Sequence, residues 1–236
     1  MKNPVPATSY PMLRNIALFA DLSDSALGDI AERTTWARYD RRQQIVGEGD
    51  STTDVFFVIE GTIEAKSFSA QGKEVTYSET GQGGLFGEFS AIDGEPRSAT
   101  IIATELSLVA RMTAADFLAA LLANPELHMR LTELLVMKAR AMSRRIFEFS
   151  TLAVRNRIHA ELLRLAKADA AADNTAVIEP APTHHELATR VSTHREAVTR
   201  ELNQLSAKGI LKAAKRQILI TDVQRLQDLV EEPSFD

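Results

Sequence analysis

The residues best suited to bind a charged ligand lie in a glycine-rich stretch. Residues 85–100 read LFGEFSAIDGEPRSAT, with Glu88 near one end and Arg97 near the other. Gly87 and the two glycines before it allow tight turns, whose backbone amides can surround an anion. The Arg97 guanidinium is always charged and suits a phosphate, Ser98 adds a hydroxyl, and a Glu carboxylate suits a ribose hydroxyl. The combination indicates a sugar-phosphate ligand, although a surface salt bridge on a glycine-rich loop would leave the same pattern.

A second polar group lies on a pair of short helices. Residues 183–205 read THHELATRVSTHREAVTRELNQL. Thr183, with Glu186 three residues later, forms a capping box at the start of the first helix. We expect Thr193 to cap the second helix in the same way.

The second helix would present a polar face at its N-terminal end. Arg195, Glu196, Thr199 and Arg200 share this exposed face. N-terminal residues of a recognition helix are the ones that reach DNA base edges, where Arg bonds guanine and Glu accepts from cytosine. An ordinary amphipathic helix hairpin with ion pairs is the alternative. A basic turn with Lys215 and Arg216 follows between two apolar runs, which predicts a small β-hairpin.

Two kinds of segment, helical and glycine-rich extended, precede the long helix and must position these groups. Residues 13–35 carry apolar residues at helical spacing around a Leu-Ser-Asp cap signal, which predicts one or two short helices. Residues 113–123 are predicted to form a helix capped by Thr113. Between them, from about Trp36 to Met112, short β-branched and aromatic runs alternate with nine of the 11 glycines. This pattern favours a compact antiparallel barrel or jelly roll.

A long helix is predicted from Pro125 to about Ser150, and proline suits its first turn. Its apolar residues follow a near-heptad spacing that suits packing against a twin helix, with packing on its own domain as the alternative. The stripe comprises Leu131, Leu135, Met142, Ile146 and Phe149. A helix over residues 152–169 and a loop over residues 168–175 follow.

Composition excludes several classes of protein. The 236 residues carry a net charge of −5 and no cysteine, which removes disulfides, thiolate metal sites and cysteine nucleophiles. The N-terminus has neither a signal peptide nor a membrane span, so we expect a cytoplasmic protein without a membrane partner. The charge of residues 183–225, eight basic against four acidic, is locally positive, as a DNA-facing surface would be.

The motif F-G-E, followed by P-R-S-A, resembles the phosphate-binding cassette of cyclic-nucleotide-binding domains. The resemblance spans about residues 13–123 and implies an eight-stranded β-roll. It implies that Gly87 and Glu88 meet the ribose 2′-hydroxyl and that Arg97 and Ser98 hold the cyclic phosphate. The other cassette residues expected at the ligand are Phe89, Ser90 and Ala99. Relatives that sense haem or iron–sulfur clusters need His or Cys ligands, and no histidine precedes His128.

The stretch R-E-x-V-x-R is similar to the winged helix-turn-helix of the cyclic-AMP receptor protein and fumarate–nitrate regulator superfamily, in its cyclic-AMP receptor branch. Arg195, Glu196 and Arg200 match the base-reading trio of that branch. Ser192 departs from the glycine that many such turns contain, and would be mildly strained at a positive φ. The complete set of expected DNA contacts is Thr183, His184, Thr193, His194, Arg195, Glu196, Thr199, Arg200, Lys215 and Arg216.

The resemblance also places Met142 and Ser143 where relatives carry a Thr-Ser pair that touches the nucleobase. Ser143 matches this pair and Met142 does not, so cyclic AMP and cyclic GMP both remain candidate ligands. The implied protein is an α+β transcription regulator that acts as a homodimer through the long helix. The mechanism that the resemblance implies also includes a hinge near residues 149–153. Its implied partners are double-stranded DNA and RNA polymerase, and no metal or resident cofactor is expected. The expected domains are a β-roll over 1–124, a dimerisation helix and hinge over 125–151, and a winged helix-turn-helix over 152–236.

Three alternatives remain open at this point. The chain could be a nucleotide-binding module that does not bind DNA, or a phosphodiesterase, although its five histidines form no evident metal cluster. It could also be a regulator of the same fold that responds to a non-nucleotide signal or to none.

Overall fold

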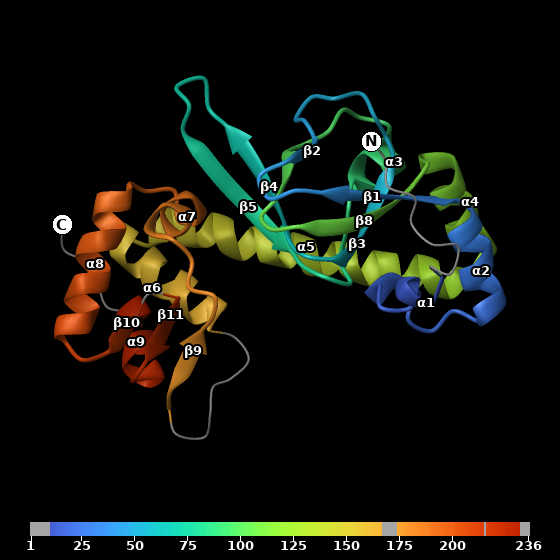
Figure 1. Ribbon diagram of the computed structural model, residues 1–236. Helices are drawn as coiled ribbons and strands as arrows, with labels where there is room; N and C mark the ends of the chain where they lie inside the picture. Colours follow the sequence, from blue (N-terminus) through green and yellow to red (C-terminus); the bar gives the residue numbers. More distant parts are fainter. Residues whose placement is uncertain (1–9, 167–173, 215, 232–236) are drawn as a thin grey trace. The chain divides into compact units, whose positions relative to one another are not determined.

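The computed structural model describes residues 10–166, 174–214 and 216–231 (Figure 1). The chain divides into two compact units, residues 1–138 and 139–236. The helix α5 (Pro125–Thr151) contributes its first half to one unit and its second half to the other.

The first unit is built on two antiparallel sheets of four strands each, in the orders β1-β8-β3-β6 and β2-β7-β4-β5 (Figure 1). The eight strands confirm the β-roll that the short glycine-punctuated runs predict. Their bounds are β1 (Thr34–Tyr39), β2 (Gln44–Val46), β3 (Val55–Glu60), β4 (Ile63–Phe68), β5 (Glu74–Thr80), β6 (Leu85–Phe86), β7 (Thr100–Ala103) and β8 (Ser107–Met112).

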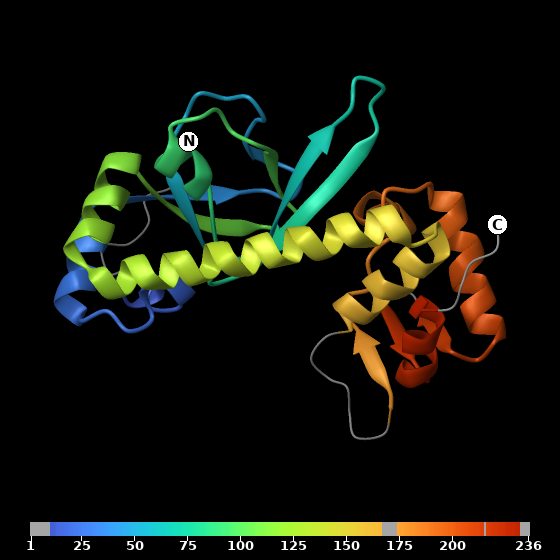
Figure 2. The same cartoon turned by 180° about the vertical axis from the view of Figure 1, so that it is seen from behind.

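Helices cover one end of this unit, as Figure 2 shows from the opposite side. They are α1 (Tyr10–Leu13), a 3₁₀ turn (Ala17–Phe19), α2 (Asp24–Glu32), α4 (Ala114–Ala123) and the first half of α5. A further short helix, α3 (Glu88–Asp93), lies within the cassette. The predicted caps are confirmed, because Ser23 accepts from the Ala26 amide at 3.2 Å and Thr113 accepts from the Asp116 amide at 3.1 Å.

Strand β3 is buried on both faces, which explains its continuous apolar run. Phe56 and Val58 lie in a core cluster formed by residues of both sheets, inside the roll. Phe57 and the other odd-numbered residues of β3 lie in a second cluster, shared with the helices. The two faces of one strand therefore hold the roll closed and attach the helices to it.

The long helix differs from its predicted apolar stripe. Leu131 is 3% exposed in the core of the first unit and Leu135 packs against that core, so both serve their own domain. Phe149 is half-buried, whereas Met142 and Ile146 are exposed. Six large apolar residues of α5 are exposed, namely Met129, Val136, Met137, Met142, Ile146 and Phe147. The alternative of packing on its own domain therefore holds for Leu131 and Leu135, whereas pairing of this helix with a twin helix stays a prediction.

The second unit contains the helix pair and a small sheet (Figure 1). Its sheet has the order β10-β11-β9, so the predicted hairpin gains a third strand that the sequence reading missed. The helix predicted over 152–169 ends at Leu165, and residues 167–173 lie outside the described residues. The elements are α6 (Val154–Leu165), β9 (Ala176–Ile178), α7 (His184–Arg190), α8 (Arg195–Ala207), β10 (Leu211–Ala214), β11 (Gln217–Ile220) and α9 (Val223–Glu231).

Candidate functional site

Gly87 forms the turn on which the cassette depends. It lies at φ 84° between β6 and α3, a left-handed conformation that glycine adopts without strain. A Cβ atom here would come within 2.7 Å of both Arg97 Nη1 and the Asp54 carbonyl oxygen. Another residue type would require both the guanidinium and the Asp54 backbone to move, and would still be strained at this φ.

The Arg97 side chain lies against this turn and is almost fully enclosed, with 4% of the residue exposed. Its Nη1 donates to the Gly87 carbonyl at 3.1 Å, its Nη2 to the Asp54 carbonyl at 2.8 Å, and its Nε to Thr52 Oγ1 at 3.1 Å. The guanidinium also lies 5.5 Å from the centroid of the Phe56 ring. Arg97 therefore joins the Gly87 turn to the segment that holds Thr52 and Asp54, besides offering a charge.

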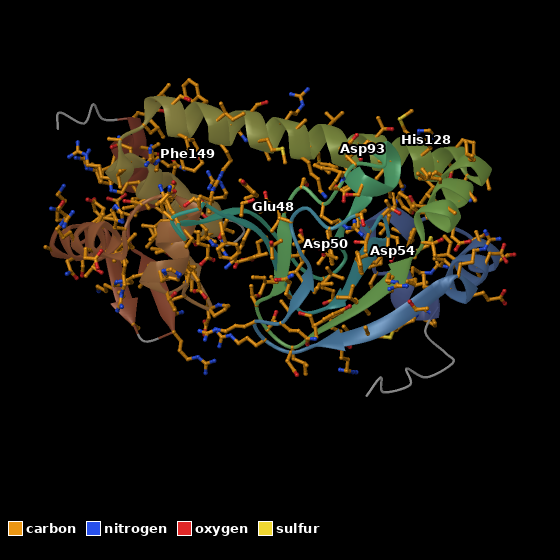
Figure 3. The ribbon with its side chains drawn as sticks, turned by 90° about the horizontal axis from the view of Figure 1, so that it is seen from above. Glu48, Asp50, Asp54, Asp93, His128 and Phe149 are labelled. Atoms are coloured by element: carbon orange, nitrogen blue, oxygen red, sulfur yellow. The ribbon has the colours of Figure 1, made fainter. Side chains whose placement is uncertain are left out.

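The surroundings of Arg97 are acidic. Burial lowers the pKa of the Arg97 guanidinium, and the carboxylates of Asp54, Asp50 and Glu88 oppose this effect. Asp50 and Asp54 lie on the segment between β2 and β3, where they are labelled in Figure 3. The Asp50 carbonyl also accepts from the Arg97 amide at 2.9 Å, which fixes the cassette to this segment. Arginine stays protonated under such conditions, so the site keeps a buried positive charge.

Glu88 is buried with 3% exposure and is paired with a lysine. Lys138 Nζ, on α5, lies 2.6 Å from Glu88 Oε1 and 3.3 Å from the Leu85 carbonyl. The same ammonium lies 6.0 Å from the centroid of the Phe89 ring. The sequence reading missed Lys138, because no spacing pattern links residues 50 positions apart.

The other residues expected at the ligand differ in accessibility. Ser98 is exposed and Ala99 half-buried, whereas Ser90 is only 3% exposed. On the second unit's part of α5, Met142 is 49% exposed and the Ser143 hydroxyl donates to the Ala139 carbonyl of its own helix at 3.0 Å. The base-contacting role of these two residues stays a prediction.

The predicted capping box is present at the start of α7. Thr183 Oγ1 accepts from the Glu186 amide at 3.2 Å, and Glu186 Oε2 accepts from the Thr183 amide at 2.6 Å. Ser192, in the turn, adopts a φ of 52°, so the expected strain at this serine is present. The expectation that Thr193 caps the second helix is wrong. The N-cap of α8 is His194, whose side chain makes no capping hydrogen bond.

The reading face of α8 is partly as predicted. Arg195, Glu196 and Arg200 are exposed, but Thr199 is half-buried. The Thr199 hydroxyl donates to the Arg195 carbonyl at 3.0 Å, and the same oxygen lies 2.7 Å from His184 Nδ1. Because a hydroxyl has one proton, His184 Nδ1 is the donor to Thr199. This contact joins the first turn of α7 to α8.

A buried pair fixes the opposite face of α8. His159 Nε2, from α6, lies 2.6 Å from Glu201 Oε1, and the two residues are 2% and 8% exposed. The hydrogen bond with His159 lowers the pKa of the Glu201 carboxyl, against the effect of burial. No helix-turn-helix pattern indicates this pair, since its members lie 42 positions apart.

The hairpin β10–β11 supplies the wing. Leu211 pairs with Ile220 and Ala214 with Gln217, and Arg216 is exposed at the turn. Lys215, expected to contact DNA, lies outside the described residues. In the part of the chain that the structure describes, no group of three or more His, Asp or Glu could hold a metal ion. None of the described helices is both long and apolar enough to cross a membrane.

Comparison with known proteins gives two family matches in the order of the units. The family model of the cyclic nucleotide-binding domain matches residues 36–124, and that of the Crp-like helix-turn-helix domain matches residues 156–229. The cAMP-activated global transcriptional regulator CRP of Haemophilus influenzae is 27% identical over 78% of this chain and 82% of its own length. The cyclic AMP receptor protein of Thermus thermophilus is 27% identical over 81% of this chain and 86% of its own length.

Solved structures share the fold at lower identity. A variant of CooA from Carboxydothermus hydrogenoformans aligns with a TM-score of 0.77 at 17% identity, over 98% of each chain. The c-di-GMP responsive regulator CLP of Xanthomonas campestris aligns with a TM-score of 0.72 at 19% identity, over 84% of this chain and 99% of its own. With both domain families matched in order and related regulators aligned over most of its length, the chain belongs to the CRP/FNR superfamily and is a DNA-binding transcription regulator with a cyclic-nucleotide-binding domain.

Proposed function

We propose that this regulator is controlled by a cyclic mononucleotide, cyclic AMP or cyclic GMP, bound at the cassette of the β-roll. The observation that carries the proposal is the buried guanidinium of Arg97 beneath the Gly87 turn, beside the buried carboxylate of Glu88. A buried charge is retained where it has a task that an apolar residue could not perform. A cyclic phosphate beside a ribose would use both groups.

The geometry supports this ligand in a specific way. Three protein acceptors use three of the five N–H groups of Arg97, which leaves two for a phosphate. The exposed Ser98 hydroxyl lies next to it in the chain. Glu88 would accept from the ribose 2′-hydroxyl while its other contact, the ion pair with Lys138, stays in place. Phe89, Ser90 and Ala99 would complete the wall of the site.

The output of the regulator would be binding of a homodimer to an inverted repeat. The exposed apolar side chains along α5 support pairing with the same helix of a second chain. The exposed Arg195, Glu196 and Arg200 would read a TGTGA-like half-site, with Thr183, His184, His194 and the wing on phosphates. Thr193 and Thr199 complete the proposed contact set. A position in the cytoplasm and contact with RNA polymerase belong to the same proposal.

The nucleotide would act by favouring one of two arrangements of the dimer. Met142 and Ser143, on α5, would extend the ligand contacts from the roll to the dimer helix. The ligand can shift the balance only by its difference in affinity between the two arrangements.

A same-fold regulator with another effector, or none, is the second candidate. It is favoured by the hydrogen bonds and the ion pair within the cassette, which give Arg97 and Glu88 partners from the protein itself. Met142, which offers no hydroxyl to a base, points the same way.

Calorimetric titration with cyclic AMP and cyclic GMP separates the two candidates. Saturable binding of either nucleotide, together with tighter binding to an inverted-repeat operator when it is bound, supports the proposal. Absence of binding by both nucleotides to protein that still binds DNA would establish the second candidate.

A further inference from the structure

A buried carboxylate in the second unit joins three helices. Glu161, on α6, is 2% exposed. Its Oε2 lies 3.1 Å from Arg145 Nη1 of α5 and also bonds Arg164 of α6, while its Oε1 lies 3.6 Å from Arg190 Nη1 of α7. One acidic side chain thus contacts arginines from α5, from its own helix α6 and from α7. The helix pair α7 and α8 is called the reading head below.

The end of α5 makes further bonds in the same cluster. Arg164 Nη2 lies 2.7 Å from Glu148 Oε1, which is a second ion pair between α5 and α6. The Phe149 ring lies close to two guanidinium groups, with Arg145 at 5.3 Å and Arg157 at 5.2 Å from its centroid. The last turns of α5 are therefore attached to α6 through charge pairs and through an aromatic ring.

The same arginines also reach the turn of the helix-turn-helix. Arg145 Nη2 donates to the Arg190 carbonyl, and Arg157 Nε donates to the Val191 carbonyl at 3.2 Å. Arg157 Nη1 in addition donates to the Leu152 carbonyl, between α5 and α6, at 3.2 Å. The segment expected to act as the hinge, residues 149–153, is therefore contacted by Arg145 of α5 and by Arg157 of α6.

We propose that Arg145, Glu161 and Arg190 are positioning residues that lock the end of α5 to the turn of the helix-turn-helix. The part of α5 after Lys138 and the reading head then move as one rigid body. The arginine–glutamate cluster, defined as Arg145, Glu148, Glu161, Arg164 and Arg190, is the lock. The expected hinge at residues 149–153 is therefore rigid in this conformation.

The cluster has a consequence for regulation, which rests on the proposed nucleotide function. Met142 precedes Arg145 by one helical turn, so the two residues lie on neighbouring positions of one helix face. A shift of α5 imposed at Met142 and Ser143 would reach Arg145 directly and pass through Glu161 to Arg190. Removing one member of this buried ion network leaves the others with one partner fewer in a buried setting, so we expect the whole cluster to weaken.

The rigid body can be tested without any nucleotide. The chain contains no cysteine, so Arg140→Cys on α5 and Asn203→Cys on α8, both exposed, can be spin-labelled cleanly. Labelled chains diluted in excess unlabelled chain report the distance within one chain. We expect a narrow distance distribution that broadens in Arg145→Gln and in Glu161→Gln. Arg144→Gln is the matched control, because Arg144 is the exposed neighbour of Arg145.

The coupling is measured as the ratio of operator dissociation constants without and with cyclic AMP. We expect Arg145→Gln to reduce this ratio by about tenfold, while Arg144→Gln leaves it unchanged. Glu148→Gln removes only the half-buried pair with Arg164, so it is less prone to misfold. We expect it to reduce the same ratio by less than Arg145→Gln does.

The two proposals fail in different ways. Distance distributions that stay narrow in folded Arg145→Gln and Glu161→Gln would overturn the lock, whatever nucleotide does. A protein that binds no nucleotide but shows the broadening keeps the lock and loses the nucleotide function.

Discussion

Arg97 should support both the fold of the β-roll and the binding of the ligand, and the two roles can be separated by comparison with Ser98. Arg97→Ala removes the guanidinium donor from the Asp54 carbonyl and the Thr52 hydroxyl, and one of two donors from the Gly87 carbonyl, which also accepts from the Ala91 amide at 3.3 Å. An unmade hydrogen bond in a buried site costs about 1–3 kcal/mol, so the free energy of unfolding should fall by about 3 kcal/mol or more. That is a large share of the roughly 5–15 kcal/mol typical of a domain.

Ser98→Ala should instead leave the fold intact. Ser98 is exposed, and surface substitutions usually change stability by less than about 0.5 kcal/mol. The lost hydrogen bond to a charged phosphate should cost about 1.5–3 kcal/mol, or roughly ten- to a hundredfold in nucleotide affinity. Arg97→Ala should lose at least as much affinity.

A natural probe allows both measurements on the same samples. Trp36 is the one tryptophan of the chain and lies on β1, so its fluorescence during urea unfolding reports on the first unit. Calorimetry with cyclic AMP gives the affinity. Unchanged affinity in Ser98→Ala would refute the cassette assignment. Unchanged stability in Arg97→Ala would refute the structural role that its three hydrogen bonds imply.

Three further predictions concern selectivity, DNA and pH. Because Met142 offers no hydroxyl to a base, the affinities for cyclic AMP and cyclic GMP should differ by less than about a thousandfold in calorimetry. Glu196→Ala should relax the preference at one base pair in a selection from random DNA, whereas Arg216→Ala and Lys215→Ala should weaken binding to all sequences and lower its salt dependence; an unaltered motif in Glu196→Ala would place the reading head elsewhere. The folded-state pKa of Glu201 is lowered, so its stabilising effect is complete above the unfolded-state pKa of 4.5 and is lost as pH falls through the folded-state value. Acid titration of circular dichroism should therefore show a shallower loss of second-unit stability in Glu201→Gln than in the natural chain, and parallel curves would contradict the pairing with His159.

Features with a short-range cause were predictable from the sequence. The caps at Ser23, Thr113 and Thr183 follow from a side chain that reaches an amide three residues away. The turn at Gly87 follows from the conformational freedom of glycine. The strands of the roll follow from runs of β-branched residues between glycines.

Features that depend on the three-dimensional path were not predictable. Lys138 meets Glu88, and His159 meets Glu201, only after the chain has folded. The apolar spacing of α5 predicts a packed stripe, but spacing alone does not tell whether Leu131 packs on its own roll or on a twin helix. At α8, Thr193 has the right side chain for a cap, yet the helix begins one residue later than that cap requires.

The order of the small sheet in the second unit has a consequence for how the reading head folds. Strand β9 pairs with β11, so that Val177 lies opposite Leu219, and both helices of the reading head lie in the chain between them. The Asn174 carbonyl accepts from the Val223 amide at 2.9 Å just beyond this pairing. The helix pair therefore lies within a long chain loop whose two ends are paired as strands. Closing a loop of this length costs chain entropy before the contacts between its ends can form. The closed loop contains α8 and the first strand of the wing, so we expect the wing and the recognition helix to fold and unfold together.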